Sequence, residues 1–557
     1  MLFQRIKLVV LPCAALAVLA ACGGSDSGGN APSYTVGGTI TGLSAPGLVL
    51  VNGSDTLSPA ANATAFAFPA SVSGTSYDVA IKVQPNGLKC TVTSASGTVA
   101  SAKVTSVAVS CPSPWVWMGG VQANNAPAVY GTMGVAAAAN TPGGRSIGAS
   151  WTDAAGNLWI FGGYDTVGAL GDLWEYAPGT GLWTWVSGLA THDFAGIYGT
   201  QGVADAGNHP GARGSSAAWI DGAGNLWLFG GYGHDSTGGN PGQLNDLWEF
   251  SLSTGLWTWM GGAQTVNSMG NYGTLGAAAA SDLPPAREGA NAWRDKSGNF
   301  WLFGGLSPAP IYASPSTSTG LLNDVWMYNL QSGLWTWVGG SNEVWGLFSG
   351  SGGGVYGTQG MPAAGNIPTP RSGAVAWTDG EGNFWLFGGG YAGNGQGTAL
   401  LNDLWQLNPT TGLWAWMSGS NMPGDALSGI YGDEGTPAAA NVPGARSQSS
   451  TWTDRTGKLW LLGGVTEGSN PDACCSTSND LWSYDPGSGE WTWVSGSMAD
   501  GTTPPGVYGT LGTPGVGNVP GGRAGAVTFV DGSGNLWLYG GGPWKGTLAD
   551  LWRFTPP

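Results

Sequence analysis

Six arginines recur at one position of an internal repeat, and their side chains suit the binding of an anion. Each follows a tyrosine by fifteen residues, and the six are Arg145, Arg213, Arg287, Arg371, Arg446 and Arg523. A guanidinium is a planar cation with five donors that grips a carboxylate or sulfate through two parallel hydrogen bonds. The alternative is structural, because a residue present in every copy can pair with an Asp or with backbone carbonyls and so hold the copies together. The sequence leaves both open.

Metal binding is the second kind of chemistry to consider. His192, His209 and His234 fall in loops of one region, where they form either a chance metal trio or exposed loop side chains. An Asp also recurs in each D-x-x-G-N turn, as at Asp379, but its spacing lacks the alternating oxygen ligands of a calcium loop. An Asp that caps its own turn explains the pattern more simply. We therefore expect no metal and no cofactor.

Catalytic groups do not stand out from the repeat. We find no Ser-His-Asp arrangement, Gly-rich phosphate loop or close pair of carboxylates in the sequence. The sequence therefore assigns no catalytic residue and favours a protein that is not an enzyme.

The elements that position these residues are short strands. Residues 371–419 hold four apolar-aromatic runs, AVAW, NFWLFGG, DLWQL and LWAWM, each closed by Gly, Asp, Asn or Pro. Such runs predict four antiparallel strands. The pattern recurs six times, but the sixth copy ends before its fourth run, while an isolated run at residues 115–118 precedes the first copy. We therefore predict an all-β, six-bladed propeller whose last sheet is closed by this N-terminal strand.

The repeat resembles the kelch motif, which also occurs in the propeller of galactose oxidase-like proteins. The shared features are Arg-x-Gly opening a strand, a Gly pair ending the next, Asp-x-Trp in the third and Gly-x-Trp in the fourth, over about residues 113–557. The resemblance implies a propeller, a fold that hosts enzymes and binding modules alike. Copper oxidase chemistry would require a cluster of His and Tyr ligands and a Cys cross-linked to a Tyr, and no Cys lies in an early repeat.

The first 33 residues are typical of an exported lipoprotein. Residues 1–21 combine Arg5 and Lys7 with an apolar run too short to span a bilayer, which indicates a signal peptide. The residues around Cys22 resemble the bacterial lipobox, which implies acylation of Cys22, although ordinary signal cleavage beside a chance Cys is the alternative. Gly23 then favours an outer-membrane location in the cell envelope. Residues 22–33 form a lipidated linker rich in Gly and Ser.

Residues 34–112 differ in composition and precede the propeller at residues 113–557. Their alternating apolar runs predict a small immunoglobulin-like or transthyretin-like β-sandwich. Export to an oxidising compartment favours a disulfide between Cys90 and Cys111. Cys474 and Cys475 are adjacent, and they are a vicinal disulfide, an intermolecular link or free thiols.

Binding is expected on one face of the propeller. The connections between second and third strands, and between fourth and first, are long and irregular, as at residues 232–245, 306–323, 341–354 and 465–479. We call the face that carries these connections the long-loop face, and the opposite face the short-turn face. Variation on one side of a rigid scaffold favours recognition there. Exposed aromatic side chains could stack on sugar rings; those considered are Tyr164, Tyr232, Tyr312, Trp345, Tyr391 and Trp544.

The sequence therefore favours a membrane-anchored, extracytoplasmic propeller that binds a glycan or an envelope protein. A net charge of −16 argues against nucleic acid as a partner, because phosphates would be repelled. Two alternatives remain: a carbohydrate enzyme similar to galactose oxidase or to the kelch propellers that epimerise sialic acid, and an assembly or adhesion component. The oligomeric state and the choice between the periplasmic and outer side are not decided by the sequence.

Overall fold

The computed structural model describes most of the chain. The described residues are 32–85, 88–308, 319–346, 354–392, 398–422, 428–466, 476–498, 502–543 and 546–556. Every regular element longer than a turn in these ranges is a β-strand. Helices long and apolar enough to cross a membrane do not occur in these ranges.

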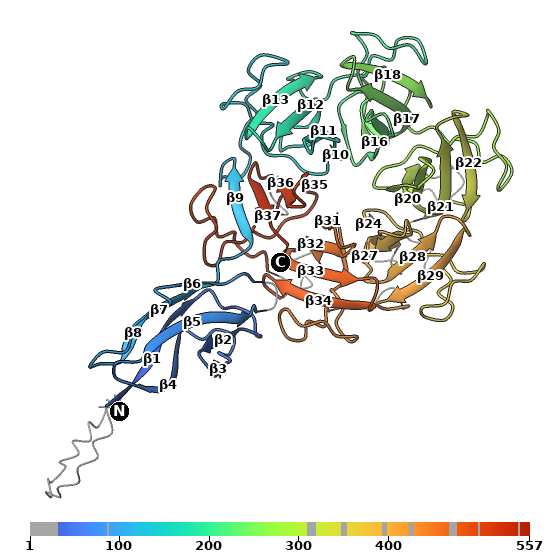
Figure 1. The fold of residues 1–557 in the computed structure, drawn as a ribbon. Coiled ribbons are helices and arrows are strands. Elements are labelled where there is room, and N and C mark those ends of the chain that lie inside the picture. The colour runs from blue at the N-terminus through green and yellow to red at the C-terminus, as the bar shows by residue number, and fades with distance from the viewer. Residues whose placement is uncertain are drawn as a thin grey trace, which may run out of the picture.

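The N-terminal region folds as two four-stranded sheets around a core of its own. One sheet has the order β4-β1-β8-β6 and the other β3-β2-β5-β7. Their strands are β1 (Ser33–Thr41), β2 (Val49–Asn52), β3 (Asp55–Leu57), β4 (Ala65–Val72), β5 (Ser76–Val83), β6 (Thr91–Thr93), β7 (Ser96–Thr98) and β8 (Val104–Ser110). Residues such as Val36, Phe68 and Val107 fill the space between the sheets. This part of the chain is a small sandwich that lies beside the larger region (Figure 1).

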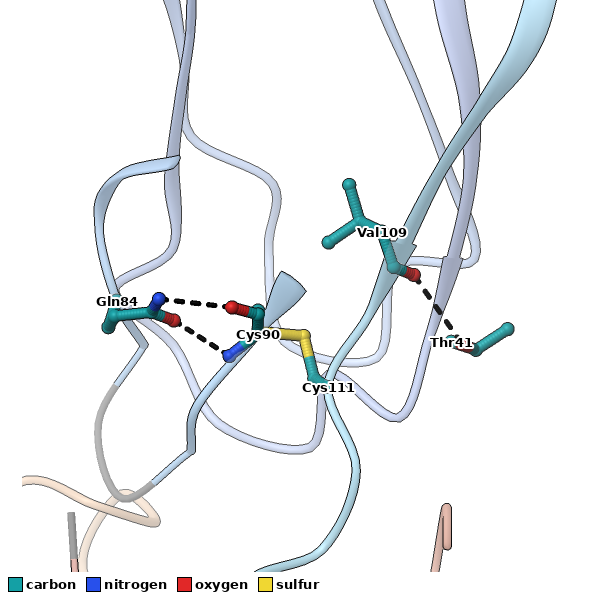
Figure 2. The surroundings of a disulfide bond; sticks show 5 residues. All are labelled: Thr41, Gln84, Cys90, Val109 and Cys111. Atoms are coloured by element: carbon teal, nitrogen blue, oxygen red, sulfur yellow. Dashed lines mark hydrogen bonds between the residues drawn. A yellow bond between two sulfur atoms is a disulfide. The ribbon is translucent and has the colours of Figure 1, made fainter. Parts of the chain in front are cut away.

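The predicted disulfide between Cys90 and Cys111 is confirmed (Figure 2). Gln84 holds the first of these residues, because its amide donates to the Cys90 carbonyl at 3.1 Å and accepts from the Cys90 amide at 2.7 Å. The second lies at the end of β8, where its amide donates to the carbonyl of Thr41. The bond therefore fixes the end of the sandwich from which the chain continues into the larger region.

The larger region repeats one antiparallel sheet pattern. The first sheets contain β10 (Ala149–Thr152), β11 (Leu158–Tyr164), β12 (Ala169–Ala177) and β13 (Leu182–Ser187); then β14 (Arg213–Gly214), β15 (Ala217–Ile220), β16 (Leu226–Gly233), β17 (Gly242–Ser251) and β18 (Leu256–Gly261); then β19 (Asn291–Arg294), β20 (Phe300–Pro308), β21 (Thr319–Asn329), β22 (Leu334–Gly339) and β23 (Trp345–Gly346). The four main strands of each sheet pair in chain order, while the short β14 adds to β16 and the short β23 to β21.

The remaining sheets follow the same pattern. They contain β24 (Val375–Thr378), β25 (Phe384–Phe387), β28 (Leu404–Asn408) and β29 (Leu413–Ser418), with a hairpin of β26 (Gly390–Ala392) and β27 (Thr398–Leu400); then β30 (Arg446–Ser447), β31 (Ser450–Thr453), β32 (Leu459–Thr466), β33 (Ser476–Asp485) and β34 (Glu490–Ser495); then β35 (Val527–Val530), β36 (Leu536–Tyr539) and β37 (Leu551–Phe554). The outer neighbour of β37 is β9 (Trp115–Gly119), which pairs with it antiparallel, Trp115 opposite Phe554 and Trp117 opposite Trp552.

Aromatic side chains fill the space between neighbouring sheets. Trp377 and Trp385 of one sheet, for example, share a buried cluster with Leu459, Trp482 and Trp491 of the next. Equivalent clusters lie between each consecutive pair, and one of them joins Leu158 and Trp174 of the first sheet to Phe529 and Trp537 of the last. Large aromatic groups bury much apolar area for each residue. The sheets therefore stabilise one another face to face in a propeller-like arrangement around an axis (Figure 1).

Candidate functional site

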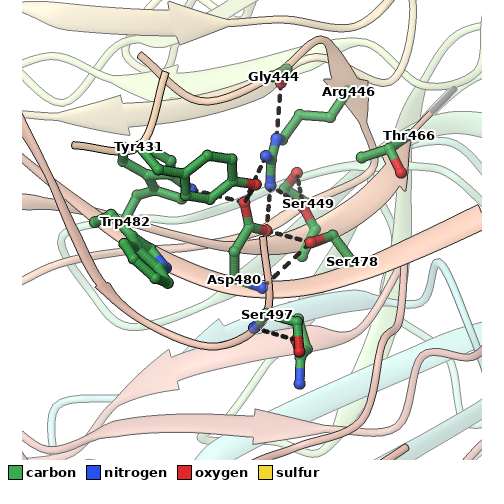
Figure 3. A network of polar contacts seen from close by, with 12 residues as sticks. Tyr431, Gly444, Arg446, Ser449, Thr466, Ser478, Asp480, Trp482 and Ser497 are labelled. Atoms are coloured by element: carbon green, nitrogen blue, oxygen red, sulfur yellow. Dashed lines mark hydrogen bonds and ion pairs between the residues drawn. The ribbon is translucent and has the colours of Figure 1, made fainter. Parts of the chain in front are cut away.

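The recurring arginines are buried in ion pairs, as Arg446 illustrates (Figure 3). Its two terminal nitrogens donate to the two carboxylate oxygens of Asp480, each at 2.7 Å. Nη1 also donates to the carbonyl of Gly463, and Nε to that of Gly444, both at 2.9 Å. Asp480 in turn accepts from Tyr431 at 2.8 Å and from the indole of Trp482 at 2.7 Å. The Tyr that precedes each Arg by fifteen residues is thus part of the same network.

All six arginines form such an ion pair with an aspartate, with arginine side chains no more than 1% exposed and aspartates fully buried. The pairs are Arg145–Asp172, Arg213–Asp246, Arg287–Asp324, Arg371–Asp403, Arg446–Asp480 and Arg523–Asp550. A charge removed from water must be paired and hydrogen-bonded, and these groups are. The expectation that the arginines bind an acidic ligand is therefore corrected. Their donors are directed at internal acceptors, so the arginines have a structural role.

The electrostatics of the network follow from the pairing. Burial alone would raise the pKa of Asp480, but the Arg446 charge and the hydrogen bonds from Arg446, Ser478 and Trp482 outweigh it, so the pKa lies below its ordinary value. The same balance lowers the pKa of Asp172 and of Asp550. These carboxylates are therefore charged at neutral pH.

A ring of backbone hydrogen bonds surrounds the axis just beyond the arginines. Each member lies two residues after a recurring Arg and donates its amide to the carbonyl of the equivalent residue in a neighbouring repeat at 2.7 to 2.9 Å. The members, in the order in which each donates to the next, are Ile147, Gly525, Gln448, Gly373, Gly289 and Ser215, which donates back to Ile147. All six have a positive φ, between 50 and 64°. The repeats are therefore joined around the axis by the backbone itself.

A cavity of about 430 Å³ opens on this ring. All six ring residues line it, together with Leu306 of β20 and with Gly390 and Leu400 of the β26–β27 hairpin. These three residues lie where the second strand of a sheet leads toward the third, on the long-loop face, so the cavity lies at the centre of that face. A separate cavity of about 400 Å³, lined by Trp151, Trp219 and their equivalents, lies on the axis toward the short-turn face and shares no lining residue with the first.

Glu288 is the one charged residue among those that line the central cavity. It is half-buried, and one carboxylate oxygen accepts a 3.1 Å hydrogen bond from the side-chain amide of Gln243. Burial raises the pKa of Glu288, and the Gln243 hydrogen bond offsets only part of that shift. Among the residues that the structure describes, Glu288 forms no ion pair. The site has the opposite sign of charge to that expected from the arginines.

The predicted aromatic residues have different environments. Tyr391 is 2% exposed and packs against Leu321 and Leu401, so it offers no stacking surface and that expectation is corrected. Tyr232 is half-buried, and its carbonyl accepts from the hydroxyl of Tyr164 at 2.8 Å. The Trp345 backbone lies in β23, but its side chain is outside the described residues, as are Tyr312, Trp544, Cys22, Cys474 and Cys475.

The histidines do not gather around one point. His192 pairs with Asp165 at 2.8 Å and His234 with Asp193 at 3.4 Å. His209 contacts the carbonyl of Pro210 and the ring of Phe194. Over the described ranges, no three His, Cys, Asp or Glu side chains are placed to hold a metal ion.

The recurring turn aspartates hold their own turns. In the fourth sheet, Asp379 accepts from the amides of Glu381 and Asn383 through one oxygen, and from the Trp385 indole through the other. These aspartates therefore cap their own turns, as the sequence indicated.

Glu288 and Gln448 were not recognised from the sequence as site residues. A signal was present, because the position after the recurring Arg is Ser146, Gly214, Ser372, Ser447 and Ala524 in the other repeats. A carboxylate at one copy of a position that otherwise holds small neutral residues is a departure that the fold does not require.

Comparisons with known proteins add little. No family model matches the chain, and no curated protein matches it. A solved structure described as "Structure of YjhT" is similar at 15% identity and a TM-score of 0.44, over 74% of this chain and 95% of that one. This likeness is too weak to carry an argument about function.

Proposed function

We propose that this protein is a non-catalytic binding module: a closed six-bladed β-propeller, completed by β9, that recognises a glycan through its long-loop face. The cavity ringed by the six positive-φ residues carries the proposal, because convergent polar groups in a concave, largely pre-formed site are typical of ligand binding. Serine hydroxyls, the Gln448 amide and the Glu288 carboxylate offer both donors and acceptors for sugar hydroxyls.

The proposed location is the outside of the cytoplasm. By the lipobox resemblance, Cys22 is acylated and tethers the protein to the outer membrane, with residues 22–33 as a spacer. The confirmed disulfide supports an oxidising compartment. In this arrangement the sandwich stands between the anchor and the propeller.

A glycan array and an envelope pull-down with a cavity-filling variant test the proposal. Ser372→Phe places a ring in the central cavity at a position without a positive φ. Ser332→Phe, in the exposed turn between β21 and β22 on the opposite face, is the matched control. We expect the wild type and the control to bind a common set of glycans that Ser372→Phe no longer binds.

Three outcomes would count against this function. If all three proteins bind the same glycans, the cavity is not the site. If glycans fail to bind but an envelope protein is retained by the wild type, the protein is an assembly or adhesion component instead. Turnover of a bound sugar would favour the enzyme alternative.

A further inference from the structure

We propose that the central cavity recognises a protonated amine on its ligand, and that Glu288 is the residue that binds it. The inference rests on the proposed binding role of the long-loop face and adds the chemical class of the ligand. The ligand is then a small hydroxyl-bearing amine, such as an amino sugar.

Glu288 and its hydrogen-bond partner Gln243 both differ from the residues that the other repeats have at their positions. Gln243 occupies a position that other repeats fill differently, with Ala169, Leu321, Leu400, Thr477 and Thr547 three residues before the buried Asp. The Gln243 backbone is itself held in place, because its N–H donates to the Asn267 side chain and its carbonyl accepts from the Asn267 backbone N–H. The fold thus positions a carboxylate that it does not need for its own assembly.

Glu288 also lacks an internal counter-charge among the described residues. Arg287, its neighbour in the sequence, and Arg213, the equivalent residue of the preceding repeat, are both committed to aspartates, with distances of 2.6 to 2.8 Å. Ionisation of a half-buried carboxylate without a cation is unfavourable, and a ligand ammonium would supply the missing charge. A hydroxyl can also donate to a carboxylate, but only an ammonium neutralises its charge, so an amine is preferred to a hydroxyl at this point.

The rest of the cavity also suits a hydroxyl-bearing amine. The other lining side chains are neutral, and Ser372, Ser447 and Gln448 provide hydroxyl and amide groups around the carboxylate. A carboxylate or phosphate on the ligand would meet Glu288 without a cation to compensate. A volume of about 430 Å³ falls within the range of pockets for small molecules. The net charge of −16 also attracts cations from a distance.

Calorimetric titration of the full-length chain with three matched sugars tests this inference. Glucosamine carries the amine, N-acetylglucosamine replaces it with a neutral amide, and glucose has a hydroxyl at the same position. We expect the wild type to bind glucosamine at least about tenfold more tightly than either neutral sugar. Glu288→Gln should remove that preference. Glu249→Gln, at a half-buried carboxylate hydrogen-bonded to Asn225, is the control and should keep it.

The outcomes separate this inference from the proposed function. Equal affinity for the three sugars, or a preference that survives in Glu288→Gln, overturns amine recognition but leaves glycan binding standing. If none of the sugars binds the wild type, the inference is also rejected, and the glycan array then decides the broader function. Glu288→Ser, which installs the residue found in three other repeats, provides a second folded variant with the same expected loss.

Discussion

The amide of Ile147 donates a 2.7 Å hydrogen bond to the carbonyl of Gly525, a residue near the other end of the chain. The bond completes a circle of six, and its geometry requires a positive φ from every member. Three members are Gly, for which this conformation has no steric cost. Ile147, with a φ of 50°, is β-branched and is the member least suited to the conformation.

Replacement of Ile147 by Gly is therefore expected to stabilise the protein. A left-handed conformation costs an ordinary residue about 1 to 2 kcal/mol, part of which is lost again to the greater freedom of Gly in the unfolded chain. We expect a net gain of up to about 1 kcal/mol, measured by urea unfolding. Ile147→Ala keeps the backbone cost and is the control. An equal gain in both variants would show that crowding of the side chain, and not the backbone, is the cause.

The neighbouring repeats are also joined by tryptophan side chains. The indole of Trp452 donates to the carbonyl of Trp537 in the next sheet at 2.9 Å, and four other repeats have the equivalent bond from Trp151, Trp219, Trp293 and Trp377. The sixth repeat has Phe529, which has no donor and instead stacks on Trp537 at 5.3 Å.

Trp452→Phe introduces the residue that the sixth repeat has at this position. It should lower the free energy of unfolding by about 1 to 3 kcal/mol, because a buried carbonyl loses its donor. The midpoint of thermal unfolding measures the effect, with Trp117→Phe, whose indole bonds within its own strand, as the control. A loss no greater than that of the control would mean that ring packing alone carries these interfaces.

The buried ion pairs should be far more sensitive to substitution than surface pairs. Asp403→Asn leaves the Arg371 charge fully buried beside a neutral amide, and removing one partner of a buried pair costs about 3 to 5 kcal/mol. Asp485→Asn removes the partner of Lys458, at 4.0 Å with both side chains nearly half exposed, and should cost less than about 1 kcal/mol. Chemical unfolding of the two variants compares them directly. Similar losses would contradict the structural role of the arginines.

Much of this architecture could be predicted from the sequence, because the spacing of Trp, Arg and Gly reports the strand pattern directly. The period predicted the sheets and the residues facing their neighbours, and Cys90 and Cys111 predicted their disulfide. The role of the arginines was left open because their partner, Asp480 in one repeat, lies 34 residues further along the chain, and the sequence alone does not show that the two meet. The prediction that Tyr391 is exposed was wrong for a similar reason, because Leu321 of the preceding sheet buries it, and such contacts between repeats cannot be seen in the sequence.

The candidate site itself depends on deviations from the repeat, which a search for recurring residues passes over. Glu288 and Gln243 lie 45 residues apart, and each occurs once at its repeat position. Only the structure shows that they share a hydrogen bond at the central cavity. Residues that the fold requires recur in every repeat, whereas residues that bind a ligand can occur in one repeat alone.

The raised pKa of Glu288 predicts how stability depends on pH. A carboxyl with a higher pKa in the folded state than in the unfolded chain favours folding below its unfolded pKa of about 4.3, and that contribution is lost as pH rises through the folded pKa. Glu288→Gln cannot ionise, so the variant should be more stable than the wild type at neutral pH, and the difference should disappear toward about pH 4. Urea unfolding across this range measures it. A carboxylate that the fold keeps at a cost to its stability is expected of a binding residue, because its compensating charge arrives with the ligand. If the variant is instead less stable at neutral pH, Glu288 has an internal cationic partner, and the case for an amine ligand is lost.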